Sequence, residues 1–262
     1  MSELDVAIEA AYEAGNSILE IYEGKYETFT KSDDSPITEA DLKSNEIIKA
    51  ILSKTNHKIL SEEDKDDQKR LSEEIIWIVD PLDGTSDFID KTGEFTVMIA
   101  LIKNKKPIIG VIGWPTEKTI FAAQKGGGAF RFSKGKWEEI SVTKVSELSK
   151  CKAVGSRHHL SEKEKMFIKR LGIKDFTSVG SSLKVGKISS GEAEAYITTT
   201  NKMKEWDSAA SYCLISEAGG KMTDMSGNDI TYNNKIVNHQ NGILVTNGLI
   251  HDKIVEEFKK LD

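Results

Sequence analysis

An apolar segment that ends in two aspartates is the first sign of chemistry in this chain. Residues 75–79 read Ile-Ile-Trp-Ile-Val, Asp80 follows at once, and Asp83 lies three positions further on. Pro81 stiffens the backbone between the two acids, and Gly84 permits a tight turn after them. A buried strand that ends in two carboxylates needs something to compensate their charge. Because a hard divalent cation binds carboxylate and carbonyl oxygens, we interpret this segment as the floor of a Mg²⁺ site.

Further acids stand at the ends of other predicted elements, and each has an ordinary explanation when it is taken alone. Asp41 and Asp207 could simply cap helices, a common role for aspartate. Glu62 and Glu63 could begin a solvated loop. The aspartate pair after the apolar strand could be a plain turn. The plain turn is the weakest of these alternatives, because the preceding strand is so apolar.

Taken together, the acids fit a two-metal hydrolase, in which two cations about 3.5–4 Å apart clamp the attacking and leaving oxygens of a phosphoryl displacement. Asp80 is placed to bridge both ions, and the Leu82 carbonyl is a plausible further ligand. Thr85 hydrogen-bonded to Asp41 would form a relay that orients and deprotonates a water molecule. A helix that begins near Asp207 would point its N–H dipoles at the site, which favours phosphate.

Other signals are weaker. His158 and His159 follow Arg157 and could contact an anionic or aromatic ligand, but a surface loop explains them equally well. Residues 181–184 (Ser-Ser-Leu-Lys) could bind phosphate at a helix start, or could be an ordinary capped helix. The glycine triplet 126–128 matches no nucleotide-binding motif and is better interpreted as a hairpin turn. No GxSxG motif supports Ser-His-Asp catalysis.

Composition describes a globular protein of 262 residues with 38% hydrophobic and 30% charged residues. The net charge of -6 argues against a nucleic-acid polymer as partner and suggests that cations mediate any contact with an anionic substrate. Cys151 and Cys213 are expected to be buried free thiols rather than a disulfide or a zinc site. The first residues show no signal peptide and no apolar run could cross a bilayer, so we expect a cytoplasmic protein without membrane contact.

Two lobes must position the chemistry. In residues 1–144, apolar periodicity predicts two long helices and then closely spaced strands with short turns, which favour an antiparallel meander that carries the metal site. In residues 145–262, strands and helices alternate, which favours a parallel or mixed α/β layer that completes the metal and substrate site. Ser161 and Glu164 form a capping box for one of these helices. The predicted N-terminal elements are helices near 4–22 and 42–52, strands near 58–60, 75–79, 95–102, 108–114, 119–124, 129–132 and 137–142, and polar loops at 31–38 and 64–74. The predicted C-terminal elements are strands at 153–156, 176–179, 195–198, 221–224 and 242–246, and helices at 161–171, 181–189, 207–218 and 249–261.

The motifs resemble those of the inositol-monophosphatase superfamily of Mg²⁺-dependent, lithium-sensitive phosphatases, over nearly the whole chain. Residues 80–85, DPLDGT, are similar to the DPxDGT signature, which is highly specific. Residues 206–210, WDSAA, resemble the second signature, WDxAA, and residues 61–63, SEE, resemble G/S-E-E. The resemblance implies an α/β (α+β) fold, a layered α/β/α/β/α sandwich of the inositol-monophosphatase and fructose-bisphosphatase type.

Within that superfamily, the chain looks most like the 3′(2′),5′-bisphosphate nucleotidases. The likeness lies in a KxDxSPxTxAD loop at 31–41, GEFTV at 93–97, GSSLK at 180–184 and the segment 155–159. Ser86 and Asp87 depart from relatives that carry Lys-Glu or Thr-Asn there, and segment 196–204 varies between substrate classes. Both departures concern substrate choice rather than the metal ligands.

The resemblance also implies a role for each site residue. Glu62, Asp80 and the Leu82 carbonyl would hold one Mg²⁺, and a second would lie on Asp80 with two further aspartates. Glu62 could help to bind a third ion. The implied catalytic residues are Asp41, Glu62 and Thr85; the implied metal ligands are Glu62, Asp80, Leu82, Asp83 and Asp207; the implied substrate contacts are Gly84, Thr85, His159, Ser181, Ser182 and Lys184.

The sequence therefore predicts a Mg²⁺-dependent phosphomonoesterase that converts adenosine 3′,5′-bisphosphate to AMP and phosphate with a metal-activated water. The alternative is the same chemistry on inositol monophosphate or fructose 1,6-bisphosphate. A non-catalytic nucleotide-binding relative would be expected to lack a ligand acid or Thr85, and all are present. A purely structural protein would leave the acids unexplained. The predicted partner is a small phosphate ester, and the predicted assembly is a monomer or a homodimer.

Overall fold

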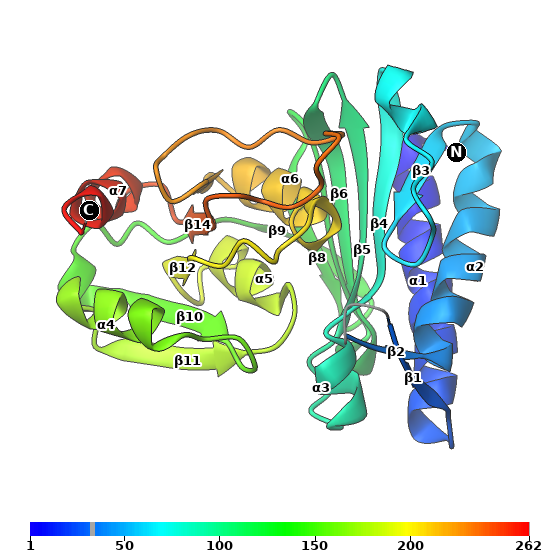
Figure 1. Cartoon of the computed structure of the whole chain (residues 1–262), viewed down its shortest axis with the longest axis horizontal. Helices are drawn as coiled ribbons and strands as arrows, with labels where there is room; N and C mark the ends of the chain where they lie inside the picture. Colours follow the sequence, from blue (N-terminus) through cyan, green and yellow to red (C-terminus); the bar gives the residue numbers. More distant parts are fainter. Residues whose placement is uncertain (32–34, 262) are drawn as a thin grey trace.

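A seven-stranded sheet forms the middle of the molecule (Figure 1). The structure is a computed structural model that describes residues 1–31 and 35–261. The strands of this sheet follow the order of the chain, from β3 to β9. β3 pairs with β4 in parallel, and all later neighbours pair antiparallel, which confirms the predicted meander. The strands are β3 (Lys58–Ser61), β4 (Ile75–Asp83), β5 (Thr96–Lys103), β6 (Lys106–Trp114), β7 (Thr119–Gln124), β8 (Gly128–Ser133) and β9 (Lys136–Ile140).

A second sheet of five strands comes from the C-terminal part of the chain. Its order is β11-β10-β12-β14-β13, with β10 parallel to both of its neighbours and β14 antiparallel to both of its own. The layer is therefore mixed, one of the two arrangements that the alternation predicts. Its strands are β10 (Lys152–Ser156), β11 (Asp175–Val179), β12 (Ala195–Thr198), β13 (Lys221–Thr223) and β14 (Ile243–Thr246).

Two long helices cover one face of the larger sheet (Figure 1). α1 (Glu3–Glu23) begins at a capping box made by Ser2 and Asp5, and α2 (Glu39–Leu52) begins at one made by Thr38 and Asp41. In such a box each side chain accepts the backbone N–H of the other residue, so N–H groups at the start of the helix are satisfied. The apolar sides of both helices pack on β4 to β7 in one buried cluster.

Two shorter helices fill the space between the sheets. α5 (Leu183–Ser189) and α6 (Ala209–Glu217) pack in a buried cluster that includes residues from both sheets. Gly110 on β6 allows α6 to approach closely, because a Cβ there would lie 2.4 Å from the carbonyl oxygen of Ala210. This close packing fixes the start of α6, and with it the turn that precedes the helix.

The last pair of helices covers the outer face of the five-stranded sheet (Figure 1). α4 (Glu162–Arg170) starts at the predicted capping box of Ser161 and Glu164, and α7 (His251–Lys259) lies beside it on a third buried cluster. From one side to the other, the layers are helices, sheet, helices, sheet and helices. The predicted α/β/α/β/α sandwich is confirmed.

Several boundaries differ from the sequence predictions. β1 (Thr28–Thr30) and β2 (Pro36–Thr38) form a small antiparallel pair at the predicted polar loop, of which residues 32–34 lie outside the described residues. The short helix α3 (Thr85–Ile89) was not predicted. The predicted solvated loop 64–74 contains a 3₁₀ turn, Lys69–Ser72, and a buried Arg70. The other 3₁₀ turns of the described chain are Ser53–Thr55, Pro115–Glu117, Leu148–Lys150 and Glu205–Asp207.

Two other expectations concern the whole chain. Cys151 and Cys213 are buried and are not joined in a disulfide, as predicted. Among the described residues, no helix combines the length and the apolar character that crossing a membrane requires.

Candidate metal and phosphate site

Strand β4 carries the first acids of the site into the interior. Asp80 is 2% exposed, and the pairing of β4 with β5 is irregular between Asp80 and Asp83. The backbone N–H of Leu82 donates to Oδ1 of Asp80 at 3.1 Å, which folds the segment back on itself. Gly84 then adopts φ +92°, where a side chain would be strained, and opens helix α3. The bulge and the glycine turn together direct the acids and Thr85 to the same end of the strand.

Three carboxylates from separate segments meet beyond this strand end. Glu62, Asp80 and Asp207 each offer an oxygen, and these oxygens lie within 4.8 Å of one another. Glu62 is there because β3 runs parallel to β4, so the two strands end at the same edge of the sheet. Asp207 comes from the 3₁₀ turn Glu205–Asp207, directly before α6.

Burial raises the pKa of Asp80 well above its ordinary value, and repulsion from Glu62 and Asp83 adds to this. Burial likewise raises the pKa of Asp207, again with repulsion from Glu62. Grouped carboxylates in a buried position are unfavourable unless a cation neutralises them. An all-oxygen donor set of this kind fits a hard divalent cation such as Mg²⁺. The residues present therefore suit the metal that the sequence predicts.

Asp83 lies outside this group of three. Its Oδ2 accepts the backbone N–H of Ser182 at 2.5 Å and the hydroxyl of Thr96 at 3.3 Å. Burial raises the pKa of Asp83, although the nearby Lys184 opposes this change. Asp83 thus links the acid group to the turn before α5. Its predicted role as a metal ligand stays a prediction.

Asp41 and Thr85 are in direct contact. The Thr85 hydroxyl donates to Oδ1 of Asp41 at 3.0 Å, and it also lies 3.3 Å from the Leu82 carbonyl oxygen. Oδ2 of Asp41 accepts the N–H and the hydroxyl of Thr38 at 2.7 and 2.6 Å. Asp41 therefore caps α2, as the ordinary explanation holds, and also has the contact with Thr85 that a relay requires. Burial raises the pKa of Asp41.

Asp207 caps its own turn and also contributes an oxygen to the acid group. Its Oδ2 accepts the backbone N–H of Lys204 at 2.7 Å, so it caps its own 3₁₀ turn. α6 begins after Asp207, at Ala209, rather than at the predicted position 207. The carboxylate therefore stands just ahead of the helix, where one of its oxygens joins those of Glu62 and Asp80 in the acid group.

A lysine at the site was missed in the sequence. Nζ of Lys31 lies 2.8 Å from a carboxylate oxygen of Glu62 and 2.8 Å from one of Glu63. Burial disfavours the charged lysine, but the attraction and hydrogen bonds of Glu62 and Glu63 together outweigh it, so the pKa of Lys31 is raised. Burial raises the pKa of Glu63 to about 7. Lys31 belongs to the loop motif 31–41, and this motif was the only feature of the sequence that could have indicated a role for Lys31 at the site.

The turn before α5 is buried and tightly held. Ser181 has φ +46°, unusual for a residue with a side chain, and is 8% exposed. Nζ of Lys184 donates to the carbonyl of Ser181 and lies 3.5 Å from that of Val179. It also lies 5.3 Å from the ring centre of Tyr196. The ammonium group of Lys184 thus supports the backbone of its own turn, and the predicted contact with a phosphate stays a prediction.

Three charged residues that the sequence analysis did not assign hold this turn from the other side. Arg157 bridges Asp87, at 3.1 Å, and Glu94. Glu94 in turn accepts the backbone N–H of Gly180 at 2.6 Å. A Cβ on Gly180 would lie 2.6 Å from the Glu94 carbonyl oxygen and 2.7 Å from Asp87. Segments far apart in the sequence are therefore locked together beside the candidate substrate residues.

His158 and His159 are exposed and form the rim of the candidate site. His158 faces Asp87 at 3.4 Å and Asp90 at 3.9 Å. His159 is exposed, and its backbone N–H donates to the Ser156 hydroxyl at 3.1 Å. The structure places His159 on the surface near the turn, which is compatible with either of the explanations left open by the sequence.

The fold is a layered sandwich whose central sheet carries buried carboxylates at one edge, next to a paired aspartate and threonine. This combination defines a class of phosphoric ester hydrolases. The model of the inositol monophosphatase family matches residues 1–262, and the chain belongs to this family. The predicted resemblance is thereby confirmed. The family consists of phosphatases, so the chain is an enzyme of the phosphoric monoester hydrolase type.

Individual relatives cover most of the chain. The 3′(2′),5′-bisphosphate nucleotidase CysQ of Shigella flexneri is 34% identical over 237 residues, which cover 87% of this chain and 93% of the relative. The protein of the same name from Escherichia coli strain K12 is also 34% identical, with the same coverage. The crystal structure of CysQ from Bacteroides thetaiotaomicron is 34% identical, with a TM-score of 0.81, over 93% of this chain and 96% of that one. An inositol monophosphatase from Thermotoga maritima is 25% identical, with a TM-score of 0.83, over 100% and 98%.

Proposed function

We propose that this enzyme is a Mg²⁺-dependent 3′(2′),5′-bisphosphate nucleotidase, which hydrolyses adenosine 3′,5′-bisphosphate to AMP and phosphate. The observation that carries the proposal is the meeting of Glu62, Asp80 and Asp207 within 4.8 Å, close to the bonded pair of Asp41 and Thr85. The substrate class comes from the relatives named CysQ, which are 34% identical over 87% of the chain.

The acids would hold two Mg²⁺ ions, or three if Glu62 also helps to bind another. Glu62, Asp80 and the Leu82 carbonyl would bind the first, and Asp80, Asp83 and Asp207 the second. When bound, such ions neutralise phosphate charge, lower the pKa of water and stabilise the leaving oxygen. Asp80 would be shared by both ions, because it is the most deeply buried acid of the group and each of the others repels its charge.

Thr85 and Asp41 would orient the attacking water and take its proton. The Thr85 hydroxyl already donates to Asp41 at 3.0 Å, so its oxygen lone pairs can accept from a water molecule on the other side. Asp41 cannot turn away, because its second oxygen is held by Thr38 at 2.6 and 2.7 Å. The water would attack in line with the leaving 3′-oxygen. We expect no covalent phospho-enzyme, since no nucleophilic side chain of the described residues is placed to form one.

The phosphate to be cleaved would lie on the backbone amides of Gly84 and Thr85. These amides open α3, so they have no acceptor within the helix and point out of its first turn. The second phosphate or the nucleoside would contact the turn at Ser181, Ser182 and Lys184, with His159 at the rim. This turn is linked to the acids through the bond from the Ser182 amide to Asp83.

The second candidate is hydrolysis of inositol monophosphate, with fructose 1,6-bisphosphate as the further substrate on the same scaffold. The observation that favours it is the likeness to the Thermotoga maritima inositol monophosphatase, whose TM-score of 0.83 is as high as that of the CysQ structure. The greater sequence identity to the CysQ relatives, 34% against 25%, favours the nucleotide.

Phosphate release with Mg²⁺ from adenosine 3′,5′-bisphosphate, inositol 1-phosphate and fructose 1,6-bisphosphate tests the proposal. We expect the highest kcat/KM on the nucleotide, and a loss of at least about 100-fold in Asp83→Asn, since removing a ligand charge acts on the metal site. Asp252→Asn is the matched control, because Asp252 lies on α7 with a side chain 81% exposed. Faster turnover of the inositol or sugar ester would refute the substrate, and full activity of Asp83→Asn would refute the metal assignment.

Lithium sensitivity follows from the family resemblance and belongs to the same proposal. We expect Li⁺ at millimolar concentration to inhibit phosphate release from adenosine 3′,5′-bisphosphate. Unchanged activity at high millimolar Li⁺ would count against this property, and an equal concentration of Na⁺ serves as the control for ionic strength.

A further inference from the structure

A buried glutamate stands two positions before Asp207 and has no place in the proposed chemistry. Glu205 is 1% exposed. Its Oε2 accepts the backbone N–H of Asn233 at 2.7 Å. Its Oε1 accepts both the backbone and the side-chain N–H of Asn234, at 2.9 and 2.8 Å. Both oxygens of one carboxylate are therefore used to hold a remote segment against the turn that carries Asp207.

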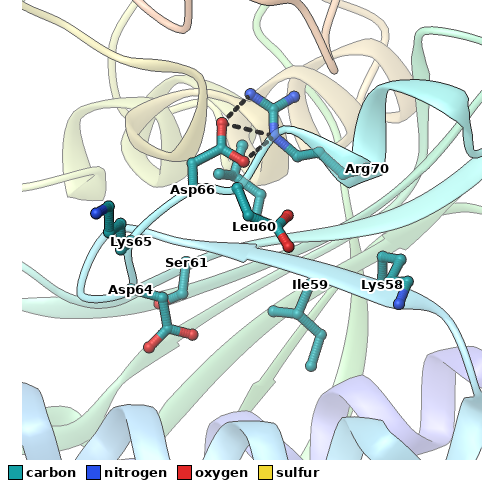
Figure 2. Close-up of a pocket in the computed structure, with 9 residues that line it drawn as sticks. Lys58, Ile59, Leu60, Ser61, Asp64, Lys65, Asp66 and Arg70 are labelled. Carbon is teal, nitrogen blue, oxygen red and sulfur yellow. Dashed lines mark hydrogen bonds and ion pairs between the residues drawn. The ribbon is translucent and has the colours of Figure 1, made fainter.

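The same remote segment is held from its other side by Arg70. The Arg70 guanidinium donates to the side-chain oxygen of Asn233 at 2.7 Å and to the carbonyl of Asn234 at 3.0 Å. Nδ2 of Asn233 returns a bond to the Arg70 carbonyl at 3.1 Å. Arg70 also pairs with Asp66 at 2.8 Å, and both line a pocket formed by β3 and the residues after it (Figure 2). The arginine, 3% exposed, is thus fixed at both ends of its planar head group.

These contacts join the segments of two acids in the group. Glu62 directly follows β3, and the chain runs from it through Asp66 to Arg70, as Figure 2 shows for the residues after β3. Glu205 lies in the 3₁₀ turn whose last residue is Asp207. Arg70, Asn233 and Glu205 therefore connect the two segments by a path that does not pass through the acid group itself. We name these three residues the brace.

A second set of bonds grips the same turn just after Asp207. The Ser208 hydroxyl lies 2.7 Å from Nε2 of His239 and 3.2 Å from the Tyr232 hydroxyl. The backbone N–H of His239 donates to the Met203 carbonyl at 2.8 Å. Segment 232–239 thus contacts the turn on both sides of Asp207, and the turn has little freedom to rotate.

We propose that Glu205 is a positioning residue, which acts through the brace to hold the carboxylate of Asp207 at metal-binding distance from Glu62 and Asp80. The inference rests on the proposed metal site. Residues outside the ligand set that orient a ligand are worth about 10- to 100-fold in metal affinity. A glutamine at 205 cannot replace the carboxylate, because its amide NH₂ would face one of the donated N–H groups.

Calorimetric titration of the metal-free enzyme with Mg²⁺ alone tests this inference. We expect Glu205→Gln to weaken Mg²⁺ binding by about 10-fold or more while the variant still folds. Glu194→Gln is the matched control: Glu194 is also buried, at 5% exposure, and accepts a backbone N–H, that of Lys152, at 2.7 Å. Glu194 lies directly before β12 and holds Lys152, the first residue of β10, at the end of that strand remote from Arg157. We expect Glu194→Gln to lower thermal stability but leave the Mg²⁺ affinity within about twofold of wild type.

The other outcomes are also decisive. Wild-type affinity in Glu205→Gln, or equal weakening in Glu194→Gln, would overturn the inference. If Glu205→Gln does not fold, Asn234→Ala removes the side-chain N–H that donates to Glu205 at 2.8 Å, together with its local bond to the Thr231 carbonyl at 2.7 Å. It should weaken Mg²⁺ binding by a few-fold, whereas wild-type affinity there would overturn the inference. A wild-type protein that binds no Mg²⁺ would refute the proposed function itself, which separates the two failures.

Discussion

At the scale of single residues, the buried acids that would bind metal lower the stability of the metal-free enzyme. Asp80 has a strongly raised pKa because it is buried and because Glu62, Asp83 and Asp207 repel it. Near neutral pH its ionised form therefore costs folding free energy, since the unfolded chain loses the proton more readily. Sites built for a bound ion often carry such a cost.

We predict that Asp80→Asn is more stable than wild type in the presence of a chelator, by on the order of 1–3 kcal/mol, because it removes one repelling charge. Asparagine can still accept the Leu82 N–H that Asp80 accepts at 3.1 Å. Thermal unfolding in EDTA measures the difference. Added Mg²⁺ should then stabilise wild type, by about 2.7 kcal/mol at 100 times its Kd, and leave the variant unchanged. Equal stability of both proteins in EDTA would contradict this prediction.

At the scale of elements, the turn between β11 and α5 depends on contacts with the N-terminal part of the chain. Glu94 accepts the backbone N–H of Gly180, and Asp83 accepts that of Ser182. Lys184, from α5 itself, donates to the carbonyl of Ser181. Because the turn is held by its backbone, its shape does not depend on a bound substrate, and it can present a preformed contact surface.

We predict that Gly180→Ala raises KM for adenosine 3′,5′-bisphosphate by about 10-fold or more and changes kcat less, because the new methyl group would lie 2.6 Å from the Glu94 carbonyl oxygen and push the turn away. Steady-state kinetics measures both constants. Gly24→Ala, at the end of α1, is the control, since a Cβ there meets nothing closer than 3.5 Å. A loss confined to kcat would show that the turn does not contact the substrate.

At the scale of the whole molecule, the outer layers make stability depend on pH. His251, 0% exposed, begins α7 and lies 2.8 Å from the Thr223 hydroxyl and 2.9 Å from that of Thr246. Burial lowers its pKa from 6.5 to about 4. Between these values the unfolded chain binds a proton that the folded protein does not, so stability is complete above pH 6.5 and falls as the pH drops towards 4.

We predict that this one group costs wild type about 2 kcal/mol between pH 7 and pH 5, and that His251→Gln lacks this part of the pH dependence. Urea unfolding of both proteins at the two pH values, with Mg²⁺ present throughout, gives the difference between them. Contributions from other groups, such as the buried His239, cancel in that difference. Parallel stability curves for the two proteins would refute the assignment.

Much of the fold could be predicted because it rests on local patterns. Capping boxes mark the starts of α1, α2 and α4, and apolar runs with short turns mark β4 to β9. The acids at the end of β4 could be recognised for the same reason, since an apolar strand followed by Asp-Pro-Leu-Asp-Gly-Thr is visible within ten residues. Boundaries were less certain, as α3 and the 3₁₀ turn before α6 show, because one or two turns of helix have little sequence signal.

The sequence by itself determined the elements, because these depend on hydrophobic period and caps. It also determined the residue types of the site and their order along the chain, because the motif residues lie near one another, and the layered sandwich followed from the family resemblance of those motifs. Only the tertiary structure decided which distant partners meet. Arg70 and Asn233 are 163 positions apart, Arg157 and Asp87 are 70, and Lys184 turns to its own backbone. No local pattern encodes such contacts, because they arise from how the sheets and helices pack, and each partner alone looks like an ordinary surface residue.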